Sequence, residues 1–577
     1  MAIDLGAIEA AMNEALPGAV VEREGDWLVV DPNQLTQVAT LLRDDMGFDF
    51  LANLTASDYA DRLEVVYNVH STRSELHGPG LGLKVRLPDQ ANPRVASLTP
   101  IWKAANFQER EVWDMYGVQF EGHPHLKRIL LWEGFEGFPM RKDWREPYYE
   151  EEHKPYSSRW PNADDPKPRR AEERVRWRAN VQYPQGFDPA EWEPIPEVDY
   201  DLGDKIDVNG LETDRIVVNI GPQHPSTHGV FRMVVGLQGE TVTSLYPVMG
   251  HLHRNHEKIG ERNLWTGNIP YTDRLDYMTP MYNEFAYVIA VERMMGQEVA
   301  ERAEYLRIIM GELARVVNHA LAIGFQFNEL GAMMTPMLYT FAEREHVLDL
   351  WEEAAGSRMM VNYFRFGGVA RDVSDDWLKR CRMVVDRLDR KLDELDRLLT
   401  DNEIFISRAR GVGAMSWQDM VNYGVSGIQL RAAGLAYDIR KVEPYSIYDS
   451  FDFEVPIQKT GDVYDRYLQR MAEARQSVKI LKQALDRIPT RGSIQAGKKP
   501  WNPKVPAGEA YSRVEHPKGE MGFYLVSDGG TNPYRYHMRS PSFANLGAFE
   551  AQSVGHLLAD AIVILGSIDI TMGEVDR

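Results

Sequence analysis

Side chains that could exchange protons with a ligand are concentrated between residues 221 and 277. The first group is GPQHPSTHGV, which covers residues 221–230 and contains His224 and His228. Its proline and flanking glycines predict a loop or hairpin turn rather than a helix. A loop tip held by strands is a rigid place from which imidazoles can meet a ligand, although two surface histidines in a turn would give the same pattern.

A second group follows in residues 250–277, GHLHRNHEKIGERNLWTGNIPYTDRLDY. It contains three histidines and a glutamate in close succession: His251, His253, His256 and Glu257. Imidazole and carboxylate ligands suit zinc or iron. However, residues two apart do not share a helix face, and the spacing matches no strong zinc motif. We therefore expect a hydrogen-bonded, arginine-rich interior segment around Arg254 and Arg262, and no metal ion.

Tyr277 ends this block, directly after Asp273, Arg274 and Asp276. A tyrosine hydroxyl, with an ordinary pKa of about 10, is a neutral proton donor that becomes useful when its anion is stabilised. A core tyrosine with a satisfied hydroxyl would be the structural alternative.

The chain has one cysteine, Cys381, in 577 residues. Iron–sulfur clusters and nickel–iron centres need several thiolates, so any redox metal must belong to a partner. This chain can supply only protons, polarity and shape. A single cysteine also rules out an internal disulfide framework and fits a reducing compartment. We expect Cys381 to be a small buried side chain.

The length of the chain predicts two to four domains. Its net charge of −21 argues against nucleic acid as a partner, because phosphate binding needs clustered cations. No window offers about 18 consecutive apolar residues, so we expect no membrane span. The amphipathic, acidic start of the chain is unlike a secretory leader.

Residues 1–145 are predicted to form a small α/β domain. Two stretches alternate in the period of half-buried strands: Leu63, Val65, Tyr67 and Val69, then Leu81, Leu83, Val85 and Leu87. HGPG (77–80) predicts a turn between them. The spacing of apolar residues predicts a helix over 100–116.

Residues 146–205 differ sharply in composition from the rest of the chain. Nine of its 32 prolines lie between Pro147 and Pro196. Proline at this density prevents regular helix and sheet, so we predict an extended connector. Its tryptophans and tyrosines favour a path along a protein surface.

Residues 206–577 are predicted to begin with strands, over 215–222 and 230–250, and to be mostly helical from about residue 250. Three helical stripes support this prediction. They are Leu306, Ile309, Leu313 and Val317; Val385, Leu388, Leu392, Leu395 and Leu399; and Tyr464, Leu468, Met471, Val478, Leu481, Leu485 and Ile488. The last two stripes predict long helices that pack antiparallel. The fold class is therefore α+β.

Long motifs in this chain resemble two subunits of respiratory complex I, the proton-pumping NADH–quinone oxidoreductase. The block 221–277 resembles the D subunit, as do EREHVLDLWEEAAGSRM (343–359), NYFRFGGVARD (362–372), RARGVGAMS (408–416), YGVSGIQLRAAG (423–434), GEMGFYLVSDGGTNPYRYHMRSPSF (519–543) and SIDITMGEVDR (567–577). EREVWDMYGVQFEGHPHLKRILLWEGFEGFPMRKDW (109–144) resembles the C subunit. The whole chain, apart from the connector, resembles the fused C/D subunit of some bacteria.

This resemblance implies a fold and a site. The D part is similar to the large subunit of nickel–iron hydrogenases with the metal site lost, and its former cavity receives a quinone. By their match to the family motifs, His228 and Tyr277 are the residues expected to contact the head group of the quinone. His224 matches a supporting histidine, and Arg254 matches an arginine near the terminal tetranuclear iron–sulfur cluster of the adjacent B subunit. This chain is thus expected to bind no cofactor of its own, with quinone as the substrate.

The sequence departs from the family pattern at Glu329, in ELGAMMTP (329–336). The family usually has aspartate there, as the partner of the quinone-binding histidine. Glutamate keeps the charge but is one methylene longer. We expect Glu329 to pair with His228 at an altered reach.

The resemblance implies a peripheral subunit on the cytoplasmic face of the bacterial inner membrane. The expected partners are other complex I subunits, above all B, and also I, G and H. The C-like part is expected to be a docking domain, and the ending GEVDR (573–577) is expected to pack against the B subunit. A hydrogenase-like catalytic subunit would need four metal-binding cysteines. A purely structural subunit remains the alternative.

Overall fold

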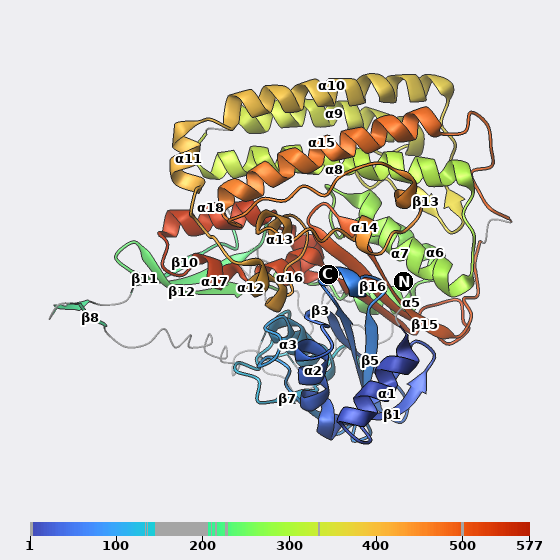
Figure 1. Ribbon diagram of the computed structural model, residues 1–577, viewed down its shortest axis with the longest axis vertical. Coiled ribbons are helices and arrows are strands. Elements are labelled where there is room, and N and C mark those ends of the chain that lie inside the picture. Colours follow the sequence, from blue (N-terminus) through green and yellow to red (C-terminus); the bar gives the residue numbers. More distant parts are fainter. Residues whose placement is uncertain are drawn as a thin grey trace, which may run out of the picture.

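The computed structural model describes residues 4–132, 134–135, 137–144, 206–208, 211–213, 216–224, 229–332, 335–497 and 501–577. The predicted connector, residues 146–205, lies outside these residues, and so does His228. Figure 1 shows a small domain below a stack of long helices. A sheet formed by residues 508–516, 519–527 and 535–539 lies between the two.

The small domain is built on a five-stranded sheet with the strand order β1-β2-β5-β4-β3. The strands are β1 (Val20–Glu24), β2 (Trp27–Val30), β3 (Phe50–Asp58), β4 (Leu63–His70) and β5 (Leu81–Leu87), with β6 (Arg94–Ala96) and β7 (Gln119–Glu121) paired separately. The helices are α1 (Leu5–Ala15), α2 (Leu35–Asp44) and α3 (Ala105–Tyr116). The strands predicted from alternation are confirmed. The connection between them covers residues 71–80 and includes a short 3-10 helix, Ser74–Leu76, before HGPG (77–80).

Two predictions for this domain need correction. The helix predicted over 100–116 begins only at Ala105. The residues before it form tight turns, which the buried carboxylate of Glu109 holds by accepting hydrogen bonds from Ser97 and Leu98. Strand β4 is buried along its whole length and not on one face. Its second face packs on the larger domain, where Val66 meets Tyr524 and Val526.

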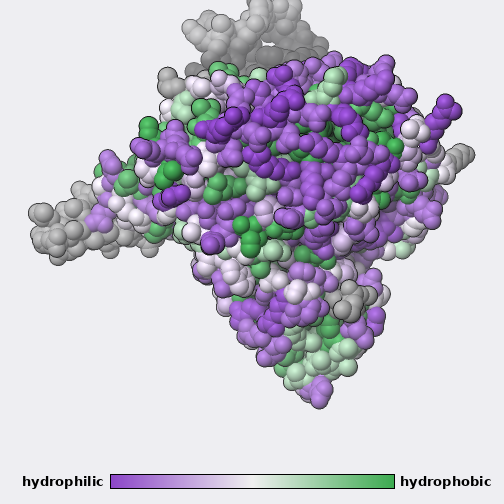
Figure 2. Space-filling view, turned by 45° about the horizontal axis from the view of Figure 1, so that its top comes forward, coloured by the Kyte–Doolittle hydropathy of each residue, from purple (hydrophilic) through white to green (hydrophobic). Residues whose placement is uncertain are grey.

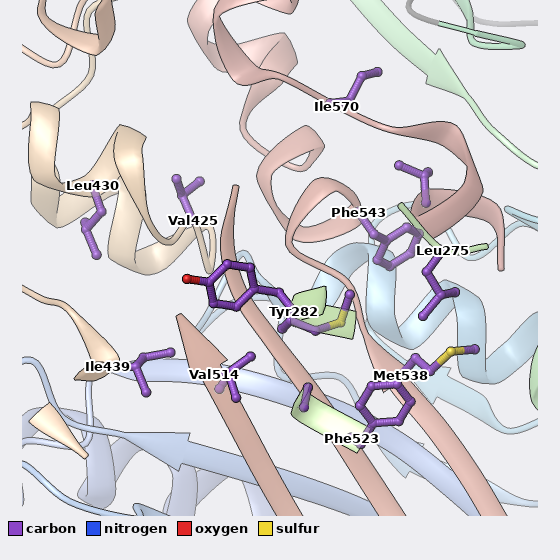
Figure 3. Packing of buried hydrophobic residues seen from close by; sticks show 14 of the residues in the cluster. Leu275, Tyr282, Val425, Leu430, Ile439, Val514, Phe523, Met538, Phe543 and Ile570 are labelled. Atoms are coloured by element: carbon purple, nitrogen blue, oxygen red, sulfur yellow. The ribbon is translucent and has the colours of Figure 1, made fainter. Parts of the chain in front are cut away.

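The larger domain begins with the predicted strands, after the short pair β8 (Ile206–Val208) and β9 (Leu211–Thr213). Strands β10 (Ile216–Ile220), β11 (Arg232–Gln238) and β12 (Thr241–Val248) form an antiparallel sheet in sequence order. A second sheet was not predicted: β15 (Gly508–His516), β16 (Gly519–Ser527) and β17 (Arg535–Arg539). Figure 3 shows the apolar core on this sheet, with Val514, Phe523 and Met538 among its residues.

The helical part comprises fifteen helices of the described chain. They are α5 (His256–Arg262), α6 (Trp265–Thr272), α7 (Pro280–Met295), α8 (Glu301–Glu329), α9 (Thr335–Ala355), α10 (Asp375–Leu399), α11 (Glu403–Ala409), α12 (Trp417–Asn422), α13 (Ile428–Ala432), α14 (Ile439–Val442), α15 (Val463–Arg487), α16 (Pro541–Leu546), α17 (Phe549–Ser553), α18 (Leu558–Ile568) and α19 (Met572–Asp576). A short hairpin, β13 (Phe364–Arg365) and β14 (Gly368–Val369), separates α9 from α10.

Helices α10 and α15 pack antiparallel, as predicted. Three ion pairs between the helices show this, because the residue number rises along α10 as it falls along α15. The pairs are Arg382 with Asp486, Asp389 with Lys482, and Asp393 with Arg475. On its other side α15 packs on α8, where Glu473 faces His319 at 3.7 Å, and Glu473 also pairs with Arg431 of the neighbouring segment 428–432. Figure 2 shows that the outer face of the long helices is largely hydrophilic. Cys381 is buried in α10, as expected.

Helix α8 is, within the described part of the chain, the one helix long and apolar enough to cross a membrane. However, 94% of its apolar window is buried inside the protein. A helix that other helices cover in this way is the core element of a folded domain.

The two domains share a buried polar interface. Strand β3 is at the edge of the small sheet, and side chains from β17 satisfy its carbonyl groups. Arg535 donates to Ala56 O at 2.8 Å, and Arg539 donates to Ala52 O at 3.1 Å. Arginine side chains thus take the place of a neighbouring strand and protect the edge.

Candidate functional site

Tyr277 lies in the turn between α6 and α7, and 43% of the residue is exposed. A core tyrosine is therefore the wrong interpretation. The preceding residue, Asp276, is fully buried and fixes the turn. Its carboxylate accepts hydrogen bonds from Met278 N at 2.9 Å and from Thr279 Oγ1 at 2.7 Å. The turn thus presents Tyr277 outward from a rigid base.

A buried cluster behind this turn was not predicted from the sequence. Asp276 forms an ion pair with Lys518 at 3.0 Å, and His516 and Glu574 lie beside it. Burial, and then the charge of Asp276, raise the pKa of Glu574 to about 8. Burial lowers the pKa of His516 to about 3. At neutral pH the cluster therefore holds an ionised Asp276, a neutral His516 and a protonated Glu574.

The loop with the two predicted histidines joins β10 to β11. Because these strands are antiparallel neighbours, the predicted hairpin loop is confirmed. His224 is exposed, in the loop after the Gly221–Pro222 peptide bond. His228 lies outside the described residues, but Gly229 directly follows it. A Cβ placed on Gly229 would lie 3.2 Å from Met572 Cγ, so this end of the loop rests on α19.

The expectation of an arginine-rich interior around Arg254 and Arg262 is wrong, because both side chains are exposed. Helix α5 begins between them and buries its opposite face, which carries His256 and Glu257. Partial burial, and then the nearby charge of Arg274, lower the pKa of Arg254. Two arginines thus lie close together near Tyr277.

The second histidine group does not assemble into a metal site. His253 donates through Nδ1 to the carbonyl of Asp576 at 2.6 Å, while Glu257 pairs with Arg535 at 2.7 Å. Burial lowers the pKa of His256 to about 3. Two other buried groups have ligand atoms within reach of one ion: Glu111, Glu257 and His537, and Asp276, His516 and Glu574. Arginine and lysine side chains already compensate both groups, which favours ion pairs over a bound metal.

Glu329 is the last residue of α8 and is half-buried. Gly331 follows α8 with a φ of 87°, and the next helix is α9, whose Arg344 lies near Tyr277. Burial lowers the pKa of Arg344, and the charge of Glu345 acts against this. The pairing of Glu329 with His228 stays a prediction, because His228 is outside the described residues.

The ending 573–577 was expected to pack against a partner protein, and this is wrong. Residues 574–577 are at most 3% exposed within this chain alone. The reason is that Arg577 and Asp576 find their partners within this chain. Arg577 pairs with Glu111 of the small domain at 2.8 Å, and Asp576 accepts from Gly250 N at 2.9 Å and Leu252 N at 2.7 Å.

Comparison with known proteins matches two family models to the two domains. The model described as the respiratory-chain NADH dehydrogenase 49 Kd subunit matches residues 329–504 and 498–577. The model of the 30 Kd subunit matches residues 28–150. The larger domain alone matches a D-type NADH-quinone oxidoreductase subunit of Herpetosiphon aurantiacus, at 52% identity over 64% of this chain and 100% of that protein.

Fused relatives cover almost the whole chain. The C/D subunit of NADH-quinone oxidoreductase from Nitrosospira multiformis is 37% identical over 98% of this chain and 94% of its own length. The C/D subunit from Gluconacetobacter diazotrophicus is 37% identical over 96% and 92%. With a small sheet domain joined to a larger helical domain and matches of this extent, the chain belongs to the family of fused C/D subunits of NADH-quinone oxidoreductase, the respiratory complex I.

Proposed function

We propose that the larger domain forms the quinone head-group site of the complex, with His228 and Tyr277 as the hydrogen-bonding residues. His224, Arg254 and Glu329 support this site. The observation that carries the proposal is the contact of α19 with two separate segments. Met572 lies against Gly229, next to His228, and Gly573 lies against the backbone of Arg274 and Leu275, next to Tyr277.

The chemistry of these side chains fits quinone reduction, which takes up two electrons and two protons. Negative charge develops on the quinone oxygens as electrons arrive, and a donor aimed at them stabilises that charge. A histidine with an ordinary pKa of about 6.5 can transfer a proton at neutral pH, and a tyrosine can donate a hydrogen bond. The electrons would come from the tetranuclear iron–sulfur cluster of the neighbouring B subunit.

We further propose that residues 206–577 take the fold of the nickel–iron hydrogenase large subunit, with the metal site lost. The state of Cys381 supports this loss, because burial raises the pKa of its thiol to about 12. A thiol that resists ionisation is a poor metal ligand. Residues 146–205 would be an extended connector between residues 1–145 and this domain.

The small domain is proposed to be a docking domain for the cluster-bearing subunits, and the connector keeps the two domains at equal stoichiometry. The other subunits of the complex are partners of this chain. Among them, the B, I, G and H subunits are the proposed neighbours, and the cytoplasmic face of the inner membrane is the proposed location.

Glu329 offers a specific test of this site. In Glu329→Gln, the pKa of His228 is expected to fall by about one unit, because an opposite charge within about 4–6 Å favours the imidazolium. The pH dependence of quinone reduction by membranes should shift downward by the same amount. Glu329→Asp, which restores the usual family residue, should keep the original profile. An unchanged profile in Glu329→Gln would show that Glu329 does not act on His228.

A further inference from the structure

Residues 571–577, which we call the brace, contact three separate segments around the proposed site. They comprise Thr571, helix α19 and Arg577. The three segments are the end of the histidine loop at Gly229, the turn before Tyr277, and the stretch 250–256 that carries Arg254. All residues of the brace whose side chains make these contacts are nearly inaccessible to solvent.

The contact of the brace with the Tyr277 turn is unusually close. A Cβ on Gly573 would lie 2.7 Å from Leu275 O and 2.9 Å from Arg274 O, distances that real Cβ atoms do not reach. Only glycine permits this approach. Thr571 donates to Asp276 at 3.2 Å on the other side of the turn. Figure 3 shows Leu275 within the same apolar core as Phe543 and Met538, so the turn has little room to move.

The contact with residues 250–256 is made mainly to the backbone amides of that stretch, by the Asp576 carboxylate and the Arg577 carbonyl. Asp576 accepts from the amides of Gly250 and Leu252, and the Arg577 carbonyl accepts from His256 N at 3.1 Å and Arg254 N at 3.4 Å. These bonds fix the path of the backbone on both sides of Arg254.

The brace also reaches the small domain. The Arg577 guanidinium forms an ion pair with Glu111 of α3 and donates to Met538 O of β17 at 2.6 Å. Arg577 therefore touches the small domain, the sheet β15–β17 and the segment that carries Arg254.

We propose that the brace is a positioning element, and that Gly573 and Asp576 are positioning residues that hold Tyr277 and Arg254 in fixed relation for quinone reduction. Neither residue touches the quinone. Each acts through the backbone of the segment that it holds. This inference rests on the proposed quinone site. A displacement of about 1 Å at a reacting group can lower a rate by about 100-fold, so a brace of this kind has a large effect on turnover.

The test uses membranes that contain the whole complex with Gly573→Ala. We expect the turnover number for quinone to fall at least about tenfold, whereas NADH oxidation by an artificial acceptor, which needs only the flavin and clusters, stays within twofold. Gly267→Ala is the matched control. It lies in α6 of the same region, and its added Cβ would meet nothing closer than 3.9 Å. Quinone turnover within twofold of the unaltered complex in Gly573→Ala would overturn the proposal.

Asp576→Asn provides an independent variant if Gly573→Ala does not assemble. The asparagine side chain keeps the shape of the aspartate, but its NH2 group faces one of the two backbone N–H donors and cannot accept from it. Quinone turnover should therefore fall at least threefold, with the artificial-acceptor activity retained. Unchanged turnover, or failure of both variants to assemble, contradicts a positioning role. Tyr277→Phe in the same membranes separates the two claims. If Tyr277→Phe lowers quinone turnover while Gly573→Ala does not, only the positioning role of the brace is contradicted. If Tyr277→Phe has no effect, the proposed quinone site itself is contradicted.

Discussion

Replacing Tyr277 with phenylalanine is expected to lower quinone reduction by membranes about 10- to 100-fold. The loss of one hydrogen-bond donor to a developing oxyanion costs about this much or more in other enzymes. The substitution removes only the hydroxyl, and the turn keeps its anchor, because Asp276 and Lys518 hold it independently of the Tyr277 side chain. NADH oxidation by an artificial acceptor should remain unchanged and reports that the complex is assembled.

A matched control is Tyr305→Phe. Tyr305 is half-buried near the start of α8, and it lies 24 residues before Glu329, which is about 36 Å along a helix. The loss of the Tyr305 hydroxyl should leave both quinone reduction and NADH oxidation by the artificial acceptor unchanged. If Tyr277→Phe reduces quinone at the unaltered rate, Tyr277 is not a donor to the substrate. If both activities collapse, the residue is needed for assembly, and the structural interpretation of this chain gains support.

Replacing Arg535 with methionine is expected to lower the free energy of unfolding by about 3–5 kcal/mol. Removing one partner of a buried ion pair leaves the other charge uncompensated in the interior. Arg535 is buried and pairs with Glu257 at 2.7 Å, and it donates to Ala56 O and Thr55 Oγ1 of the small domain, each at 2.8 Å. The substitution therefore weakens the contact between the domains as well as the larger domain itself.

Denaturant-induced unfolding of the purified chain measures this change. The control is Arg382→Met, which breaks an exposed ion pair with Asp486 on the outer helices. Such pairs contribute about 0–1 kcal/mol, so the control should unfold almost as the unaltered chain does. Equal stabilities for the two variants would mean that the Arg535 network does not hold the domains together.

Local periodicity predicted those elements in which apolar residues recur at a regular spacing along the sequence. Strands β4 and β5 and the helices α10 and α15 each have an apolar face that repeats in the right period, and the structure has all four. Sheet β15–β17 escaped prediction for the opposite reason. Its second strand, β16, is buried on both faces, and β17 carries Arg535 and Arg539 into the interior, so no alternation of polar and apolar residues marks it.

The candidate site likewise contains residues that the sequence predicted and contacts that it could not predict. The sequence pointed to Tyr277 and to the hairpin loop of His224 and His228, because local chemistry and turn residues mark both. It could not indicate that Asp276 pairs with Lys518, or that the brace contacts the turn, since such long-range pairs leave no local pattern. The ending 573–577 was expected at a partner surface because it matches the ending of the family, whereas residues 574–577 are buried within this chain.

The most direct measurement is photoaffinity labelling of membranes with a quinone that carries a small photoreactive group, followed by peptide mapping of this chain. We expect label on peptides that contain residues 221–229 or 271–279, and loss of that label when excess unmodified quinone competes. Labelled peptides confined to other parts of this chain, or label at these peptides that competing quinone does not displace, would contradict a quinone site in the larger domain.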